Sequence, residues 1–316
     1  MAGKHPTYLW WKGEWTRWEE ATVHITELGW STTGGVFEGI RAYWNDDAEE
    51  LYVFRLQEHL ERLERSTRLM RIPLDYSIAT LTDAVLDLLR VNDVREDCYI
   101  RPMVYAADTA NKRFSEIGDD AEVVINTAPM PSHLLKGVEL RARVSSWRRI
   151  GDDTMPPRVK GFSNYRNGQL AGREARLDGY DTAFLLDARG KVAEAPGACV
   201  MLVRNGTLIT PDVTSSILES ITRDALITLA RESLGLDVVE RQVDRTELYL
   251  AEEVFTCGTA AEITPIVAID RLDVGTGEPG PITRDLERLF HDVLRGQEDR
   301  YAHWRTPVGV AAAVPA

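Results

Sequence analysis

The feature that most limits how this chain folds is a proline- and glycine-bearing stretch, APMPSHLLKG, which starts at Ala128. Prolines and glycines this close together interrupt helices and central strands. The apolar patterns before and after the stretch differ, so we expect residues 127–136 to link two domains. We predict a small domain over residues 1–126 and a larger one over residues 137–316, and 316 residues suffice for both.

The pattern before the expected linker is that of a small α+β domain. Leu56, Leu60 and Leu63 would line one face of a charged helix, and Ser77 is a candidate N-cap of a second helix. Lys12-Gly13 reads as a turn between the first two strands. Alternating apolar residues predict strands over residues 8–11, 23–25, 36–44, 98–106 and 121–127.

The pattern after the linker predicts a larger, β-rich domain. Asn205-Gly206 between two apolar runs is the strongest hairpin signal in the chain. We expect helices over residues 222–234 and 282–294, and strands over residues 138–146, 182–186, 199–203, 207–210, 238–243 and 253–256. The predicted fold class is therefore α+β with two domains.

Composition excludes several classes of function. A net charge of −13 argues against a surface that binds duplex nucleic acid. No apolar run reaches the roughly 18 residues of a membrane span, and the amino-terminal residues lack the pattern of a signal peptide. The three cysteines and six histidines form no metal-binding motif. We therefore expect a cytoplasmic protein with small-molecule partners and no metal.

Lys160 is the first candidate for a catalytic residue. It stands between apolar residues in the segment PPRVKGFS, and an amphipathic run over residues 167–177 follows, so we expect it near the end of a short strand that leads into a helix. The chain has only six lysines and uses arginine elsewhere. An arginine keeps its charge, whereas a desolvated lysine can form a Schiff base with a carbonyl. A solvated surface lysine is the ordinary alternative.

Three further features would complete a site for an aldehyde cofactor that carries a phosphate. Ser220-Ile221-Thr222 opens a predicted helix, whose N–H groups and dipole favour a phosphate. The segment CGTAA from Cys257 follows a strand and would present further N–H groups. Glu194 is placed to pair with a pyridine nitrogen and keep it protonated. Each feature alone is also typical of a helix cap, a turn or a solvated acid.

Eight motifs, in order, carry a resemblance to a known family: GGVFEGIRAY, FRLQEHLERL, YIRPMV, VKGFSNYRNGQLAGREA, GYDTAFLLDARGKVAEA, SITRDAL, ELYLAEEVFTCGTAAEITP and GPITRDLERLF. Over residues 22–295 the chain resembles the branched-chain amino acid aminotransferases, which are fold-type IV pyridoxal-phosphate (PLP) enzymes. The resemblance implies a small α+β domain, a larger pseudobarrel-like domain, PLP at their junction and a homodimer or higher homo-oligomer. It implies transamination of branched-chain L-amino acids with 2-oxoglutarate.

The resemblance also implies roles for individual residues. Lys160 would be the Schiff-base lysine and proton shuttle, Glu194 would pair with the pyridine nitrogen, and Tyr165 would bind the ring hydroxyl. The phosphate would be held by Arg55, Ile221, Thr222 and Thr259, with Ser220 at the same helix start. The substrate would contact Thr32, Phe37, Gly39, Arg41, Tyr99, Arg101 and Ala260, and Arg101 would take the second carboxylate of glutamate.

Two departures from the family pattern keep alternatives open. Thr32 stands where the branched-chain enzymes usually carry a pocket tyrosine, and the loop after YIRP reads AADTANKRFSEIGDD, with Lys112 and Arg113. Both changes favour a wider, more polar pocket. The alternatives are an (R)-selective amine or D-amino acid aminotransferase, an aminodeoxychorismate lyase, and a binding protein of this fold without enzymatic activity.

Overall fold

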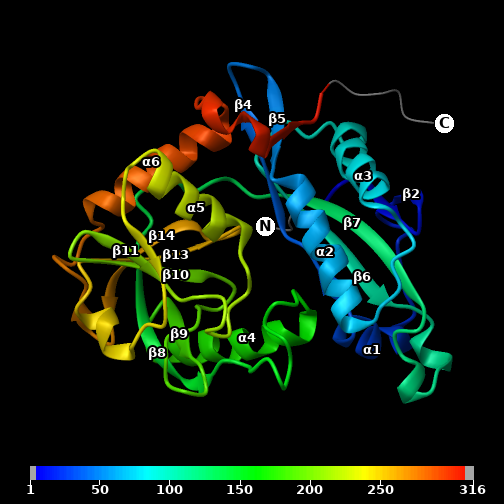
Figure 1. Ribbon diagram of the computed structural model, residues 1–316. Helices are drawn as coiled ribbons and strands as arrows, with labels where there is room; N and C mark the ends of the chain where they lie inside the picture. Colours follow the sequence, from blue (N-terminus) through cyan, green and yellow to red (C-terminus); the bar gives the residue numbers. More distant parts are fainter. Residues whose placement is uncertain (1–4, 310–316) are drawn as a thin grey trace. The chain divides into compact units, whose positions relative to one another are not determined.

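The computed structural model describes residues 5–309 and divides them into two compact units (Figure 1). The first unit consists of residues 5–132, Val159–Ser163 and residues 293–309, and the second of His133–Arg158 and Asn164–Asp292. Within the described residues, each unit contains one eight-stranded sheet. The predicted class, α+β with two domains, is confirmed.

The division of the chain differs from the expected one in two places. Val159–Ser163 belong to the first unit, because Gly161 bridges to Val36 there. The end of the chain belongs to it as well, because β16 (Arg305–Pro307) pairs with β5 (Glu50–Phe54). Such pairings join residues far apart in the sequence. The prolines and glycine of the expected linker mark a local interruption of structure, so they could not indicate these pairings.

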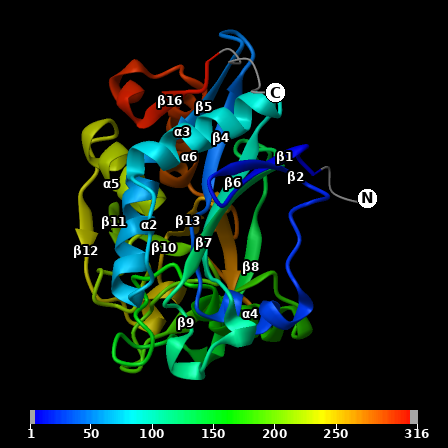
Figure 2. The ribbon, with the colours of Figure 1, turned by 90° about the vertical axis from the view of Figure 1, so that its right-hand side faces the viewer.

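The sheet of the first unit is antiparallel and has the order β16-β5-β4-β6-β7-β1-β2, with β3 paired to β6. The long strands β6 and β7 lie side by side in both ribbon views (Figure 2). Both were expected, and both are confirmed. The remaining bounds are β1 Tyr8–Trp11, β2 Glu14–Arg17, β3 Val36–Phe37, β4 Ile40–Asn45, β6 Cys98–Ala106 and β7 Ala121–Pro129.

Two predictions for this unit were wrong in detail. No strand forms over residues 23–25: residues 23 and 24 belong to no helix or strand, and Ile25 begins the 3-10 helix η1 (Ile25–Glu27), which α1 (Leu28–Thr33) follows. The partner of β1 is β2. The strand expected over residues 36–44 is interrupted between β3 and β4. The Phe37 N–H donates to the Lys160 carbonyl oxygen at 3.0 Å, so backbone pairing turns there to another segment.

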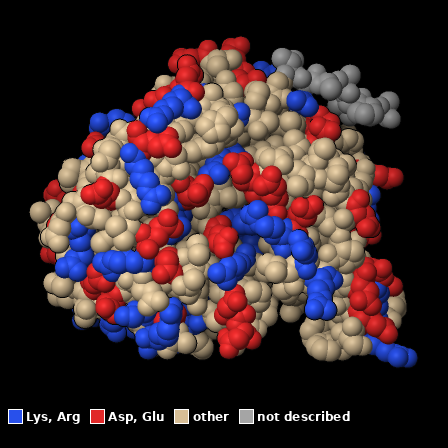
Figure 3. Space-filling model, viewed as in Figure 1, with Lys and Arg blue, Asp and Glu red and all other residues tan. Residues whose placement is uncertain are grey.

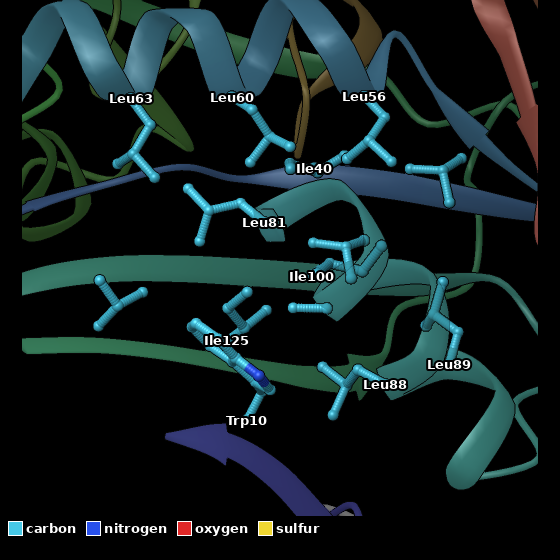
Figure 4. Packing of buried hydrophobic residues seen from close by; sticks show 14 of the residues in the cluster. Trp10, Ile40, Leu56, Leu60, Leu63, Leu81, Leu88, Leu89, Ile100 and Ile125 are labelled. Atoms are coloured by element: carbon cyan, nitrogen blue, oxygen red, sulfur yellow. The ribbon is translucent and has the colours of Figure 1, made fainter. Parts of the chain in front are cut away.

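Helices α2 (Leu56–Met70) and α3 (Ile78–Val91) build the core of the first unit against the sheet. Leu56, Leu60 and Leu63 point from α2 into this core, as Figure 4 shows, and all three are buried. The Ser77 hydroxyl accepts from the Thr80 N–H at 3.1 Å, which confirms the expected N-cap of α3. Each buried leucine stabilises the fold by roughly 1.5–3 kcal/mol, so α2 is held firmly.

The sheet of the second unit is mixed, in the order β12-β11-β10-β13-β14-β8-β9, with β15 paired to β14. Asn205 and Gly206 have φ angles of 50° and 72°, which confirms the expected hairpin. The bounds are β8 Leu140–Arg148, β9 Thr182–Leu186, β10 Cys199–Arg204, β11 Thr207–Thr210, β12 Val238–Glu240, β13 Glu253–Gly258, β14 Glu262–Ile269 and β15 Leu272–Asp273.

Strand β14 was not predicted from the sequence, because Pro265 lies inside it and a proline argues against a central strand. The remaining helical bounds are α4 Phe162–Leu177, α5 Ile221–Glu232, α6 Pro281–Arg295, η2 Thr109–Asn111, η3 Phe114–Glu116, η4 Arg245–Tyr249 and η5 Asp299–Trp304. Among residues 5–309, no helix combines the length and apolar character needed to cross a bilayer. Basic and acidic side chains lie interspersed on the face drawn in Figure 3.

Candidate active site

The segment that carries Lys160 is tied to β3 within the first unit. Besides the bond from Phe37 to the Lys160 carbonyl, the Phe162 N–H donates to the Gly35 carbonyl oxygen at 3.1 Å. A Cβ on Gly35 would lie 2.9 Å from the Val104 carbonyl oxygen, so this close approach requires glycine. The strand expected before α4 is thus reduced to a single bridge at Gly161, and the helix expected after it is present.

The Lys160 side chain is buried, with 7% of its surface exposed. Its Nζ lies 5.1 Å from the centroid of the Phe37 ring, and that ring stacks on Phe162 with 4.6 Å between centroids. The Lys160 N–H faces the Ser66 hydroxyl of α2 at 3.4 Å. The expected desolvation of this lysine is confirmed, and its catalytic role remains a prediction.

Three buried charged or titratable side chains form a network in the same unit. Both oxygens of the fully buried Glu38 accept from Arg62, at 2.7 and 2.9 Å, and His59 Nδ1 lies 2.7 Å from Glu38 Oε2. Burial alone would raise the pKa of Glu38, but Arg62 and His59 outweigh it and lower that pKa strongly. Burial lowers the pKa of His59, and the charges of Arg62 and Lys160 act in the same direction.

This network was absent from the sequence-based prediction, although the sequence contains a signal for it. His59, Arg62 and Ser66 fall at the helical spacing of the apolar face of α2, and all are buried with it. A charged residue on the apolar face of a helix is buried only when an oppositely charged or hydrogen-bonding partner is buried with it. Glu38, the acid that follows the apolar pair of β3, is the partner.

Arg55, the expected phosphate ligand, lies at the start of α2 with a left-handed backbone at φ 48°. Its N–H donates to the Trp304 carbonyl oxygen at 2.7 Å, and its Nε donates to Glu58 at 2.6 Å. Arg62 is seven residues further along the helix, about 10 Å at 1.5 Å per residue. The charge of Arg62, together with that of Lys160, lowers the pKa of His59.

Four of the expected substrate residues share one region of the first sheet. Arg41 pairs with Tyr99 across β4 and β6, and the Arg101 guanidinium lies 5.4 Å from the Tyr99 ring. A Cβ on Gly39 would lie 1.9 Å from the Tyr99 hydroxyl oxygen, so the phenol packs directly over the glycine backbone. Arg41 Nη2 donates to the Met130 carbonyl oxygen at 2.7 Å.

The loop over residues 107–120 is attached to the helix that carries Thr32. The Glu27 carboxylate accepts from the Thr109 N–H at 2.6 Å and from the Thr109 hydroxyl at 2.7 Å. Phe114 packs edge-on against Trp30, with 5.2 Å between centroids. Thr32 itself is exposed and donates to the Leu28 carbonyl oxygen at 3.0 Å. Lys112 pairs with Asp120 within the loop.

In the second unit, Glu194 is a buried carboxylate between β9 and β10. Arg149 Nη2 lies 2.7 Å from its Oε1, and the Leu218 N–H donates to its Oε2 at 2.9 Å. Arg149 directly follows β8, and its Nη1 also donates to the Asn167 side-chain oxygen at 3.4 Å. The sequence reasoning missed Arg149, because no local pattern distinguishes it from the arginines beside it.

The other expected cofactor residues of the second unit lie at element ends. Ser220 caps α5, and its hydroxyl accepts from the Arg223 N–H at 3.2 Å. Ile221 and Thr222 occupy the first turn, where helical N–H groups have no carbonyl partner within the helix. Residues 259–261, with Thr259 and Ala260, form the turn between β13 and β14. Tyr165 on α4 packs beside Gly197, 3.6 Å from the position of an added Cβ.

Each unit by itself contains groups that suit a part of PLP chemically. The first unit supplies a buried primary amine, and the second supplies a buried carboxylate, a helix amino terminus and a hydroxyl-bearing turn. An amine takes up an aldehyde, a carboxylate pairs with a protonated pyridine nitrogen, and a helix amino terminus favours phosphate.

Comparison with known proteins agrees with this chemistry. The family model described as amino-transferase class IV matches residues 35–269. The probable branched-chain-amino-acid aminotransferase of Aquifex aeolicus is 43% identical over 291 residues, which cover 92% of this chain and 93% of that protein. The branched-chain-amino-acid aminotransferase of Escherichia coli K12 is 39% identical over 307 residues, covering 95% and 97%.

Solved structures give the same result. The branched-chain amino acid aminotransferase of Thermobaculum terrenum in its PLP form is 53% identical, with a TM-score of 0.94 over 97% of this chain and 99% of that one. A second branched-chain amino acid aminotransferase, solved in complex with N-(5'-phosphopyridoxyl)-L-glutamate, is 34% identical, with a TM-score of 0.90 over 96% and 99%. This chain belongs to the class IV aminotransferases, in the branched-chain aminotransferase family, and is a PLP-dependent aminotransferase.

Proposed function

We propose that this enzyme transfers the amino group of branched-chain L-amino acids to 2-oxoglutarate, with Lys160 as the residue that binds PLP covalently. The observation that carries the proposal is the buried position of the Lys160 amine against Phe37. The substrate class is supported by the names of the relatives described above, which are branched-chain aminotransferases. One of the solved relatives contains a glutamate adduct, which supports glutamate as the second amino donor.

When bound, PLP supplies an aldehyde that accepts the amino group and a ring that withdraws electrons from the substrate Cα. Lys160 would hold the aldehyde end of PLP through Nζ, and the same amine would serve the substrate Cα as general base and then as general acid. Glu194 would accept a hydrogen bond from the pyridine nitrogen, and Arg149 holds that carboxylate in place. Tyr165 would donate to the ring hydroxyl.

The phosphate is assigned to the α5 amino terminus and to the β13–β14 turn (residues 259–261). Ser220, Ile221 and Thr222 offer N–H groups and hydroxyls, and Thr259 offers a further hydroxyl. Arg55 remains the proposed arginine, and Arg62 is a second candidate because it is buried and its charge, like that of Lys160, acts on His59. Replacing each arginine by lysine and measuring PLP affinity would distinguish them.

Substrate recognition is assigned to the first unit and to the same turn. Phe37, Gly39 and Tyr99 would contact the side chain, with Thr32 and Arg41 at its edge, while Arg101 would take the second carboxylate of glutamate. Ala260 would offer its N–H to the substrate α-carboxylate. The relatives do not favour the (R)-selective amine, D-amino acid or lyase alternatives.

The experiment combines reductive trapping with half-reactions. After borohydride treatment of the holoenzyme, mass spectrometry should find a pyridoxyl adduct on Lys160, and a Lys160→Ala variant should lose it. Lys191→Ala is the matched control, because Lys191 pairs with Asp244 at 2.6 Å outside the proposed site. Conversion with L-leucine and L-glutamate supports the substrate proposal. Conversion only with D-alanine or an (R)-arylalkylamine contradicts it.

We also propose a homodimer in the cytoplasm. The dimer is implied by the family resemblance, and three buried cysteine thiols fit a reducing compartment. Light scattering coupled to size-exclusion chromatography should give twice the 35.5 kDa chain mass or a larger multiple. A monomeric mass would contradict the dimer.

A further inference from the structure

Glu262 has an unusual backbone conformation for a buried residue. It is the first residue of β14, directly after the β13–β14 turn, and its φ angle is 46° although solvent does not reach its side chain. β13 and β14 lie side by side in the second unit (Figure 1), and Gly258 pairs with Glu262 at the base of the turn. Residues with a Cβ are disfavoured in this left-handed region, and those found there cluster at functional sites.

The Glu262 carboxylate is held by His133, the first residue of the second unit. The His133 backbone N–H donates to Glu262 Oε2 at 2.8 Å, and the ring Nδ1 lies 3.0 Å from the same oxygen. The backbone and the side chain of His133 thus both contact the same Glu262 carboxylate oxygen. These contacts fix the Glu262 side chain, and with it the conformation of the backbone that leaves the turn.

Thr264 connects the same histidine to the turn itself. Its hydroxyl donates to the Ala261 carbonyl oxygen at 2.7 Å, and its oxygen lies 3.0 Å from His133 Nε2. A threonine hydroxyl has a single hydrogen, which Thr264 gives to Ala261, so toward His133 Nε2 the Thr264 oxygen acts as an acceptor when that nitrogen carries the hydrogen. The ring of His133 therefore bridges Glu262 and Thr264, and both side chains act on the residue at the end of the turn.

We propose that His133, Glu262 and Thr264 form a positioning network that orients the β13–β14 turn toward the cofactor phosphate. The proposal rests on the proposed function, which assigns the phosphate partly to Thr259 of this turn. The three residues do not touch the cofactor. They fix the last residue of the turn through the Ala261 carbonyl and the left-handed Glu262, and so fix the directions of the Thr259 and Ala260 N–H groups.

A network that only stabilised the hairpin would affect folding but would not discriminate between ligands. A network that orients phosphate-binding groups affects ligands with a phosphate and leaves those without one unchanged. The ratio of the dissociation constants for PLP and pyridoxal separates these cases, because the two compounds differ only in the phosphate.

The test uses the full-length protein, stripped of cofactor, and measures PLP and pyridoxal binding by absorption titration. Thr264→Val removes the hydroxyl and keeps the shape of the side chain. We expect its dissociation constant for PLP to rise about 10- to 100-fold, which is the effect of losing one hydrogen bond from a misdirected N–H group of the turn to the charged phosphate. The dissociation constant for pyridoxal should stay unchanged. Thr283→Val is the matched control, because the buried Thr283 hydroxyl donates to the Glu253 carboxylate at 2.6 Å at the start of α6.

Four results would overturn the proposal. If Thr264→Val weakens the binding of PLP and of pyridoxal equally, the network is purely structural. The same conclusion follows if Thr283→Val weakens PLP binding as much as Thr264→Val does. Wild-type protein that binds PLP no more tightly than pyridoxal would refute the phosphate assignment of the proposed function as well. If Thr264→Val fails to fold by circular dichroism, Glu262→Gly replaces it, because glycine accepts the left-handed φ without the carboxylate. Unchanged PLP affinity in that variant would also refute the network.

Discussion

Replacing Arg149 by methionine tests how the structure holds the carboxylate that we assign to the pyridine nitrogen. The Arg149 and Glu194 side chains are each 7% exposed and lie 2.7 Å apart. Methionine keeps much of the aliphatic volume and removes the guanidinium. Glu194 then still accepts a hydrogen bond from the Leu218 N–H at 2.9 Å, but the positive charge of Arg149 beside it is gone.

The magnitude follows from burial. Removing one partner of a buried ion pair leaves an uncompensated charge and costs about 3–5 kcal/mol, or about two to three and a half orders of magnitude in the folding equilibrium. Arg158 offers a matched control, since it pairs with Glu219 at 2.9 Å with side chains 37% and 47% exposed. An exposed pair contributes only about 0.2–1 kcal/mol, so Arg158→Met should change stability little.

The assay is urea unfolding of the cofactor-free variants, followed by circular dichroism, together with PLP titration. A double variant, Arg149→Met with Glu194→Leu, replaces the pair by apolar side chains and should recover most of the lost stability. It should nevertheless fail in transamination, because no carboxylate remains for the pyridine nitrogen. The reasoning is refuted if Arg149→Met is no less stable than Arg158→Met, or if the double variant is no more stable than Arg149→Met.

Three further predictions concern the same units. Gly35→Ala should destabilise the protein by about 1–3 kcal/mol and impair catalysis, because the new Cβ would lie 2.9 Å from the Val104 carbonyl oxygen; a melting temperature and kcat equal to wild type would contradict this. The pKa values of His59 and Glu38 are lowered, so the unfolded chain takes up protons first and stability should fall as the pH drops below about 6.5. His59→Gln should flatten the first part of that fall in melting temperature, and an unchanged profile would argue against it. All three cysteines are buried, and burial raises the pKa of the Cys98 thiol to about 12, so a thiol reagent should label them only after denaturation; fast labelling of the native protein would refute their burial.

Local elements were predictable where apolar spacing alone decides them. The face of α2 with Leu56, Leu60 and Leu63 repeats at helical spacing, and the Asn205-Gly206 turn sets its own hairpin. Prediction failed where pairing partners decide the structure. The missed strand β14 contains Pro265, and its place next to β13 and β8 comes from contacts with distant residues.

The candidate site divides along the same line. Lys160 and Glu194 were found because they stand in distinctive motifs, and their burial agrees with that prediction. Arg149 and the pairing of Glu38 with Arg62 were not predicted. The place of Arg62 on the apolar face of α2 indicates a buried charge, but no local pattern identifies the distant residue that pairs with it. The phosphate role of Arg55 remains a prediction, with Arg62 as a second candidate.

The sequence by itself determined the fold class, the family and the lysine for which we propose the catalytic role, since helical and strand periodicity and ordered motifs are properties of the chain alone. Only the tertiary structure decided which charges face one another. It placed Arg149 against Glu194, His59 and Arg62 against Glu38, and His133 between Glu262 and Thr264. The physical reason is that a buried charge is stable only beside its partner, and folding, rather than position in the sequence, brings the partners together.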